Sequence, residues 1–143
     1  MGLSLPNVRT PVGNFVPARR EGTLVFLSGQ GPFTDGERRV GKVGRDVDLQ
    51  RAYEDAKLTG LNLLAQAKRA LGSLDLVSGV IKLIGFVNAV PEFTDHPRVI
   101  NGCSDLFVEV FGSTIGGHAR SAIGVAPLPG NITVEIEAVL SVR

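Results

Sequence analysis

The sequence has little of what several classes of protein need. It contains one cysteine, Cys103, no tryptophan, one tyrosine and seven phenylalanines among 143 residues. A single cysteine cannot close a disulfide within the chain. The 15 Lys and Arg residues are nearly balanced by 14 Asp and Glu residues. Because nucleic-acid binding relies on positive surfaces and often on stacked aromatic rings, this composition argues against a nucleic-acid partner.

Long apolar runs are also missing. No stretch of 18 apolar residues occurs, and the first ten residues lack the apolar segment of a signal peptide. We therefore expect a cytoplasmic protein with no membrane partner. The length and the hydrophobic content of 43% suit one globular domain over residues 1–143. His96, His118 and Cys103 lack the spacing of zinc ligands, so we expect no metal.

Glycine, by contrast, is abundant, and it concentrates after a predicted β-hairpin. The hairpin has a first strand ending near Arg20, a turn at Glu21-Gly22 and a second strand at 23–28. Glycines at 29, 31, 36, 41 and 44 then indicate a long loop, or a loop with a small ribbon. Their spacing matches neither phosphate-binding fingerprint, so no nucleotide site is predicted.

Two segments have the periodicity of amphipathic helices. The first is predicted from Asp46, as the N-cap, to Leu71, and the second from Asp95 or Pro97 to Val110. The expected buried stripe of the first helix is Leu49, Tyr53, Ala56, Leu63, Leu64, Ala67 and Leu71. Its opposite face holds Arg51, Glu54, Asp55, Asn62 and Arg69. The second stripe includes Cys103, which we therefore interpret as a core residue and not as a nucleophile.

Three later segments are predicted to be strands. In two of them, the alternation of residues predicts on which face of the sheet the charged side chains lie. Residues 79–90 are apolar in both alternations, which is typical of a central strand covered on both faces. In the next strand Arg120 alternates with the bulky Ile123, and in the last, 132–142, Glu135 and Glu137 alternate with bulky residues. If both bulky faces turn towards the helices, the three charges share the other face. Two helices cover only one face, so we expect self-association with Arg120 near a subunit boundary.

Arg120 is the leading candidate for a binding residue, because a guanidinium is rarely buried without a partner. It could reach solvent, await an anion, or form an inter-subunit salt bridge with Glu135 or Glu137. A triad of Ser121, His118 and Glu135 is disfavoured, because His118 and Ser121 fall on opposite faces of a regular strand.

Several short motifs together resemble the RidA/YjgF family. They are "LSGQ" (27–30), "VIN" (99–101), "ARS" (119–121), "LP" (128–129) and "VEIEA" (134–138), and the resemblance covers residues 14–142. The segment "DHPRVINGCSDLFVEVFG" (95–112) is similar to the branch labelled chorismate-mutase-like or endoribonuclease L-PSP. The best-characterised family members are reactive-intermediate (enamine/imine) deaminases. The resemblance implies a single α+β domain with a mixed sheet, two helices on one face, and a homotrimer with sites in clefts between subunits.

The resemblance also implies roles for individual residues. Arg120 would bind the substrate carboxylate, and Glu135 would guide water and protons. The other positions expected to line the substrate site are Ser28, Asn101, Phe15 and Ala122. Phe15 replaces a family tyrosine, Ala122 a cysteine found in many deaminases, and His118 a proline. Ser28 has a second interpretation, as a strand-end hydroxyl that satisfies the backbone.

The expected activity is hydrolysis of small 2-imino or enamino acids, such as 2-aminoacrylate or 2-iminopropanoate, to a 2-oxo acid and ammonia. No cofactor is expected, because the imine carbon is already electrophilic. The expected partners are a small carboxylate-bearing substrate and two further copies of the chain. Two alternatives stay open: a non-catalytic binder of small carboxylates, and an endoribonuclease or translation inhibitor, which the charge balance disfavours.

Overall fold

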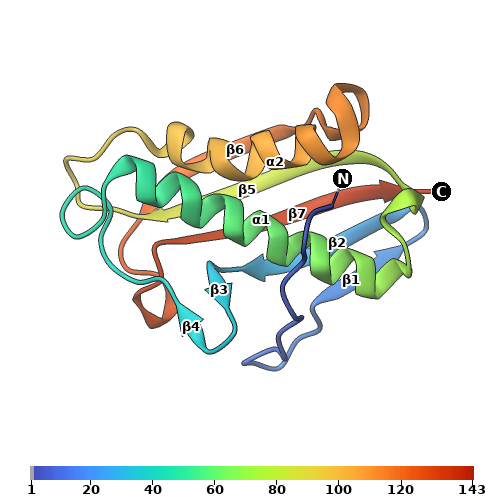
Figure 1. The fold of residues 1–143 in the computed structure, drawn as a ribbon, viewed down its shortest axis with the longest axis horizontal. Coiled ribbons are helices and arrows are strands. Elements are labelled where there is room, and N and C mark those ends of the chain that lie inside the picture. Colours follow the sequence, from blue (N-terminus) through green and yellow to red (C-terminus); the bar gives the residue numbers. More distant parts are fainter. Residues whose placement is uncertain (1) are drawn as a thin grey trace.

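The computed structural model describes residues 2–143. Two helices, α1 (Leu49–Leu71) and α2 (His96–Gly116), lie over one face of a five-stranded sheet (Figure 1). The strands of this sheet are β1 (Ala18–Glu21), β2 (Leu24–Gln30), β5 (Val77–Asn88), β6 (Ala119–Val125) and β7 (Val134–Val142). A separate ribbon is formed by β3 (Phe33–Thr34) and β4 (Glu37–Arg38), and short 3-10 turns occupy Leu74–Leu76 and Pro129–Asn131.

The sheet is mixed, with strand order β1-β2-β7-β5-β6. Strands β5 and β6 are parallel and joined through α2, whereas the other neighbouring pairs are antiparallel. This confirms the predicted α+β class, with two helices against a mixed sheet. Strands β1 and β2 form the predicted hairpin. The glycine-rich segment contains the small ribbon β3–β4, so the second of the two predicted forms, a loop with a ribbon, is correct.

Helix α1 begins two residues later than the Asp46 cap would place it. Asp46 instead accepts a hydrogen bond from the Lys42 backbone N–H at 2.9 Å and pairs with Arg45 at 3.0 Å. These contacts hold the pKa of Asp46 down at about 2, the Arg45 hydrogen bond being the largest cause. The N-cap is Asp48, whose carboxylate accepts from the Arg51 backbone N–H at 2.8 Å. The prediction for the other end was correct, since the helix ends at Leu71.

Helix α2 is longer than the sequence pattern predicts. The predicted end at Val110 is wrong, because the apolar stripe continues through Phe111 and Ile115, which pack against the core. The helix runs to Gly116 and is interrupted at Gly112, whose positive φ of 80° breaks the regular turn. Pro97 stands in the first turn, where its missing N–H has no intrahelical partner to lose.

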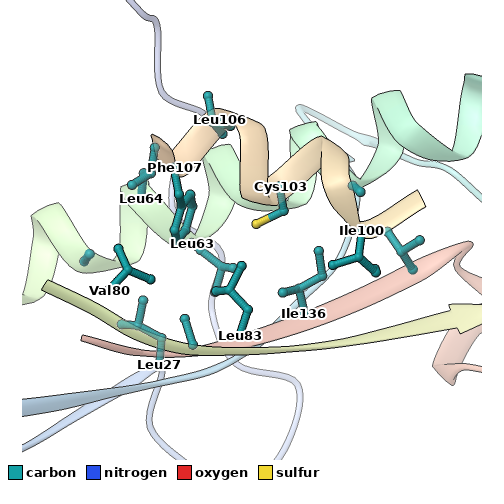
Figure 2. Packing of buried hydrophobic residues seen from close by; sticks show 14 of the residues in the cluster. Leu27, Leu63, Leu64, Val80, Leu83, Ile100, Cys103, Leu106, Phe107 and Ile136 are labelled. Carbon is teal, nitrogen blue, oxygen red and sulfur yellow. The ribbon is translucent and has the colours of Figure 1, made fainter. Parts of the chain in front are cut away.

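The core lies between the two helices and the covered face of the sheet. Figure 2 shows Phe107 and Leu63 between the helices and the sheet, with Leu83 and Ile136 rising from the strands beneath. Each such side chain contributes about 2 kcal/mol when it is removed from water. Cys103 is fully buried in this layer, which confirms its interpretation as a core residue. Burial raises the pKa of its thiol far above the ordinary value, so it is not a reactive thiolate.

Two polar residues of α1 expected in solvent are buried. Asp55 accepts hydrogen bonds from Arg39 at 3.1 Å, from Arg51 at 3.2 Å and from the Thr133 hydroxyl at 2.7 Å. Asn62 donates to the backbone carbonyls of Gly31 and Phe33. The glycine-rich segment therefore packs over this side of α1, which helical periodicity could not foresee.

The prediction that the bulky side chains of β6 turn towards the helices is wrong. In the register, Arg120 pairs with Leu83 of β5, which lies on the covered face, and Ile84, on the open face, pairs with Glu137 of β7. Arg120 therefore points towards α2, and Glu135 and Glu137 point the other way. The reason is close packing: a Cβ on Gly124 would collide with His96 of α2, so the small residues of β6 face the helix.

The open face of the sheet exposes large apolar side chains from β2, β5 and β6. Phe26 and Ile123 are each 46% exposed and Ile81 is 45% exposed. Strand β5 is an interior strand between β7 and β6. The prediction that both of its faces are covered is wrong, because within residues 2–143 the helices cover only one of them. An apolar sheet face of this kind is typical of an interface.

Candidate functional site

Arg120 reaches back from β6 onto the first half of α2. Its Nη1 donates to the Ser104 hydroxyl at 2.9 Å, and its Nη2 donates to the Pro97 carbonyl at 3.0 Å. Both acceptors are neutral. Within residues 2–143 no carboxylate lies within 4.0 Å of the guanidinium, so its charge is uncompensated in one chain. Arg120 as a residue is half-buried, and its guanidinium keeps three N–H groups for another acceptor.

The Ser104 hydroxyl also contacts His118, which continues a chain of hydrogen bonds. His118 Nε2 lies 2.8 Å from Ser104 Oγ, and His118 Nδ1 lies 2.6 Å from the Gly116 carbonyl oxygen. Arg120, Ser104, His118 and Gly116 are thus linked in series. No sequence pattern marks this cluster, because its members come from a helix, a strand and the turn between them.

Asn101 and Ala122 lie beside Arg120. Asn101 is half-buried and stands four residues after Pro97 and three before Ser104, so it belongs to the same stripe of α2 as the two residues that hold Arg120. Ala122 follows Arg120 on the same face of β6 and packs against the edge of the core. The structure therefore brings three of the six predicted site residues together.

The other three gather around a different pocket, of about 530 Å³. Phe15 and Glu135 line it directly, together with the Gly29–Gly31 backbone at the end of β2. Glu135 lies against Gly29, where a Cβ would come within 2.9 Å of its Oε2. Burial, and then the nearby charge of Glu137, raise the pKa of Glu135 above its ordinary value. The environment of this carboxyl group therefore favours its protonated form more than water does.

Ser28 anchors the wall of this pocket. Its hydroxyl donates to the Val16 carbonyl at 2.7 Å, and its backbone N–H donates to the Pro17 carbonyl at 3.0 Å. A bulge in the pairing of β2 with β7 follows Leu27 and re-aims the chain at this point. The hydroxyl therefore satisfies the backbone of the segment that carries Phe15, as the second interpretation of Ser28 expected.

Two arginines that sequence reasoning missed also line the Glu135 pocket. Arg9 lies over the ring of Phe33, with 3.6 Å from its guanidinium carbon to the ring centroid. Arg38 comes from the ribbon and lies so close to Gly130 that a Cβ there would meet its Nη1 at 2.6 Å. Both basic residues stand in loops or short strands, where no periodicity marks them.

No group of three or more His, Cys, Asp or Glu residues in the part of the chain described, residues 2–143, is arranged to hold a metal ion. Over the same residues, no helix has the length and apolarity to cross a membrane.

Comparison with known proteins gives the chain a family. Residues 1–138 match the family model described as "YjgF/chorismate mutase-like, putative endoribonuclease". The chain belongs to the YjgF family. Among curated relatives, Protein TCP17 of Trypanosoma cruzi is 38% identical, covering 100% of this chain and 90% of the relative. A 2-iminobutanoate/2-iminopropanoate deaminase of Dermatophagoides farinae is 31% identical, covering 99% and 95%.

The fold of this YjgF-family chain is also found among solved structures. The protein Atu1372 of Agrobacterium tumefaciens, described as of unknown function, is 45% identical and superimposes with a TM-score of 0.92. The match covers 99% of this chain and 87% of Atu1372. The predicted family and its two-helix, mixed-sheet architecture are therefore confirmed.

Proposed function

We propose that this YjgF-family protein hydrolyses small 2-imino acids to 2-oxo acids and ammonia. The observation that carries the proposal is the guanidinium of Arg120, held by two neutral oxygens with no carboxylate within 4.0 Å among residues 2–143. A half-buried cation of this kind is a site for an anion, and the planar fork of arginine fits a carboxylate. The deaminase name of the relative from Dermatophagoides farinae supports this choice of substrate.

The reaction needs a proton carrier beside the bound carboxylate. Water adds to the C=N carbon of the imine, and the proton that it loses passes to the nitrogen. The resulting carbinolamine then breaks its C–N bond, and ammonia leaves as the C=O bond forms. Glu135 is the proposed carrier, because burial and the Glu137 charge raise its pKa above the ordinary value. Arg120 holds the substrate in place throughout.

The proposed site requires two copies of the chain. Arg120 and Glu135 leave opposite faces of one sheet, so one substrate can meet both only where copies pack together. The exposed apolar face with Phe26, Ile81 and Ile123 is the surface on which the copies would associate. We propose that the assembly is the homotrimer implied by the family resemblance.

The test is release of 2-oxo acid from 2-aminoacrylate generated in situ. The expected result is acceleration by the purified protein and loss of at least 100-fold in kcat/KM in Arg120→Ala, about the effect of removing a bidentate charged contact. Arg69→Ala, at an exposed position at the end of α1, is the matched control and keeps full activity. Unchanged 2-oxo acid release with the wild-type protein would contradict the proposal.

A non-catalytic carboxylate binder is the second candidate. It is favoured by Phe15, whose ring lacks a hydroxyl to position water, and by Ala122 beside Arg120. Calorimetry with pyruvate separates the two functions. Binding that is lost in Arg120→Ala, without any turnover of the imine, selects the binder.

A further inference from the structure

We propose that Ser104 and His118 are positioning residues that fix the guanidinium of Arg120 for its anionic ligand; this inference rests on the proposed role of Arg120 in binding. Neither residue carries a role from the family resemblance. They are connected to Arg120 through one continuous series of hydrogen bonds, with heavy-atom distances of 2.9, 2.8 and 2.6 Å.

The direction of each hydrogen bond follows from its acceptor. The Gly116 carbonyl can only accept, so His118 Nδ1 carries the hydrogen. In neutral His118 the Nε2 atom is then an acceptor, and the Ser104 hydroxyl donates to it. The lone pairs of Ser104 Oγ are left for Arg120 Nη1. With His118 neutral, every donor in the series meets an acceptor, and the Gly116 carbonyl selects the tautomer that carries its hydrogen on Nδ1.

His118 prevents the ordinary behaviour of a serine within a helix. A helical serine hydroxyl commonly donates to the carbonyl three or four residues earlier, on its own helix. Here the imidazole takes that hydrogen, so Ser104 Oγ turns its lone pairs towards β6. Without His118 the hydroxyl can rotate, and Arg120 loses an acceptor with a fixed direction.

The anchor of the series is a tightly packed turn. A Cβ on Gly116 would come within 2.6 Å of the Phe107 carbonyl oxygen, so only glycine lets the chain pass here. The Gly117 backbone N–H donates to the Ser113 carbonyl at 3.0 Å, which closes the end of α2. The Gly116 carbonyl is therefore fixed relative to α2. This carbonyl orients the His118 ring, the ring orients the Ser104 hydroxyl, and the hydroxyl orients the Arg120 guanidinium.

The series uses neutral groups, which matters for the ligand. A carboxylate in the place of Ser104 would pair with Arg120 and compete with the substrate. A hydroxyl and a carbonyl restrain the guanidinium at two of its five N–H groups and leave its charge for the ligand.

The experiment compares Ser104→Ala and His118→Phe with the conservative variant His118→Gln. Alanine suits the middle of a helix, so Ser104→Ala is expected to fold. Glutamine places an amide oxygen near the position of Nε2 and can still accept from Ser104. The matched control is Ser113→Ala, on the same helix, since Ser113 is exposed.

Two readouts separate positioning from a structural role. For imine hydrolysis, Ser104→Ala and His118→Phe should raise KM about tenfold and keep kcat within about twofold, because the lost interaction acts on binding. The dissociation constant of pyruvate, measured by calorimetry, should rise by the same factor. His118→Gln should restore most of the affinity, and Ser113→Ala should behave as the wild type.

The outcomes for the two proposals differ. A wild-type protein with neither turnover nor pyruvate binding removes the proposed function itself. A wild-type protein that binds pyruvate, with Ser104→Ala and His118→Phe binding it equally well, overturns the positioning role alone. The same conclusion follows if these variants lose thermal stability and kcat while KM stays unchanged, or if His118→Gln binds pyruvate as weakly as His118→Phe.

Discussion

Arg120 and Glu135 lie on opposite faces of the same sheet. Arg120 pairs with Leu83 of β5 and contacts α2, whereas Glu135 pairs with Phe86 and lines the pocket at the end of β2. Backbone pairing fixes this relationship, since neighbouring residues of adjacent strands share a face. A single catalytic centre that uses both side chains must therefore combine two chains.

Subunit mixing tests this relationship. Arg120→Ala and Glu135→Gln are each expected to be inactive alone. Co-expressed in equal amounts in one cell, they should recover about a quarter of wild-type activity, because half of the arginines and half of the glutamates are intact and combine at random. Wild type co-expressed with the double variant is the reference mixture. No recovery at all would mean that the two residues do not share a site across chains.

A charge on the open sheet face should dissociate the proposed trimer. Ile123→Glu puts a carboxylate where the chain now exposes an apolar side chain, and burying that charge against another copy costs several kcal/mol. Sedimentation should show monomers, and imine hydrolysis should fall with them. Val108→Glu, on the outer side of α2, is the control that leaves association intact. A trimeric Ile123→Glu protein would place the interface elsewhere.

Glu135 should make stability depend on pH. Its pKa is raised by burial and by Glu137, so the folded state favours the protonated carboxyl. The neutral form contributes stability below the ordinary pKa of 4.5, and this contribution is lost as pH rises through the folded pKa. Glu135→Gln should therefore unfold at higher denaturant concentration than wild type at pH 8, and at nearly the same concentration at pH 4. Glu92→Gln, in an exposed loop, should show no such difference.

Asp55 should be the most costly carboxylate to remove. It is 0% exposed and accepts hydrogen bonds from Arg39, Arg51 and Thr133. The bonds from Arg39 and Thr133 join the glycine-rich segment and the residue before β7 to α1. Asp55→Ala should lower the free energy of unfolding by about 3 kcal/mol, measured by urea denaturation. The exposed Asp75, replaced by Asn, should change it by less than about 0.5 kcal/mol. If Asp55→Ala changed the free energy of unfolding as little as the Asp75 control does, the hydrogen bonds around Asp55 would add nothing to stability.

The sequence by itself determined most elements of the fold and the leading candidate for a binding residue, Arg120. Helical spacing of leucines and alanines marks α1, and alternation marks β7, because burial of one face imposes a period on the residues that face the core. The isolated arginine of β6 stands out for a similar reason, since a charge among small apolar residues needs a partner. These are local properties, which any reader of the chain can recover.

Only the tertiary structure decided where the site residues point. By hydrophobicity, Ile123 should face the helices, yet α2 passes so close to β6 that Gly124 and Ala122 fit there and Ile123 does not. Arg120 consequently reaches Ser104, which lies 16 residues earlier and is brought near by the crossover from β5 through α2 to β6. Periodicity records that one face of a strand is buried. The distance between the strand and the helix packed on it decides which of the two faces is buried. That distance depends on the tertiary structure and cannot be deduced from the local sequence pattern.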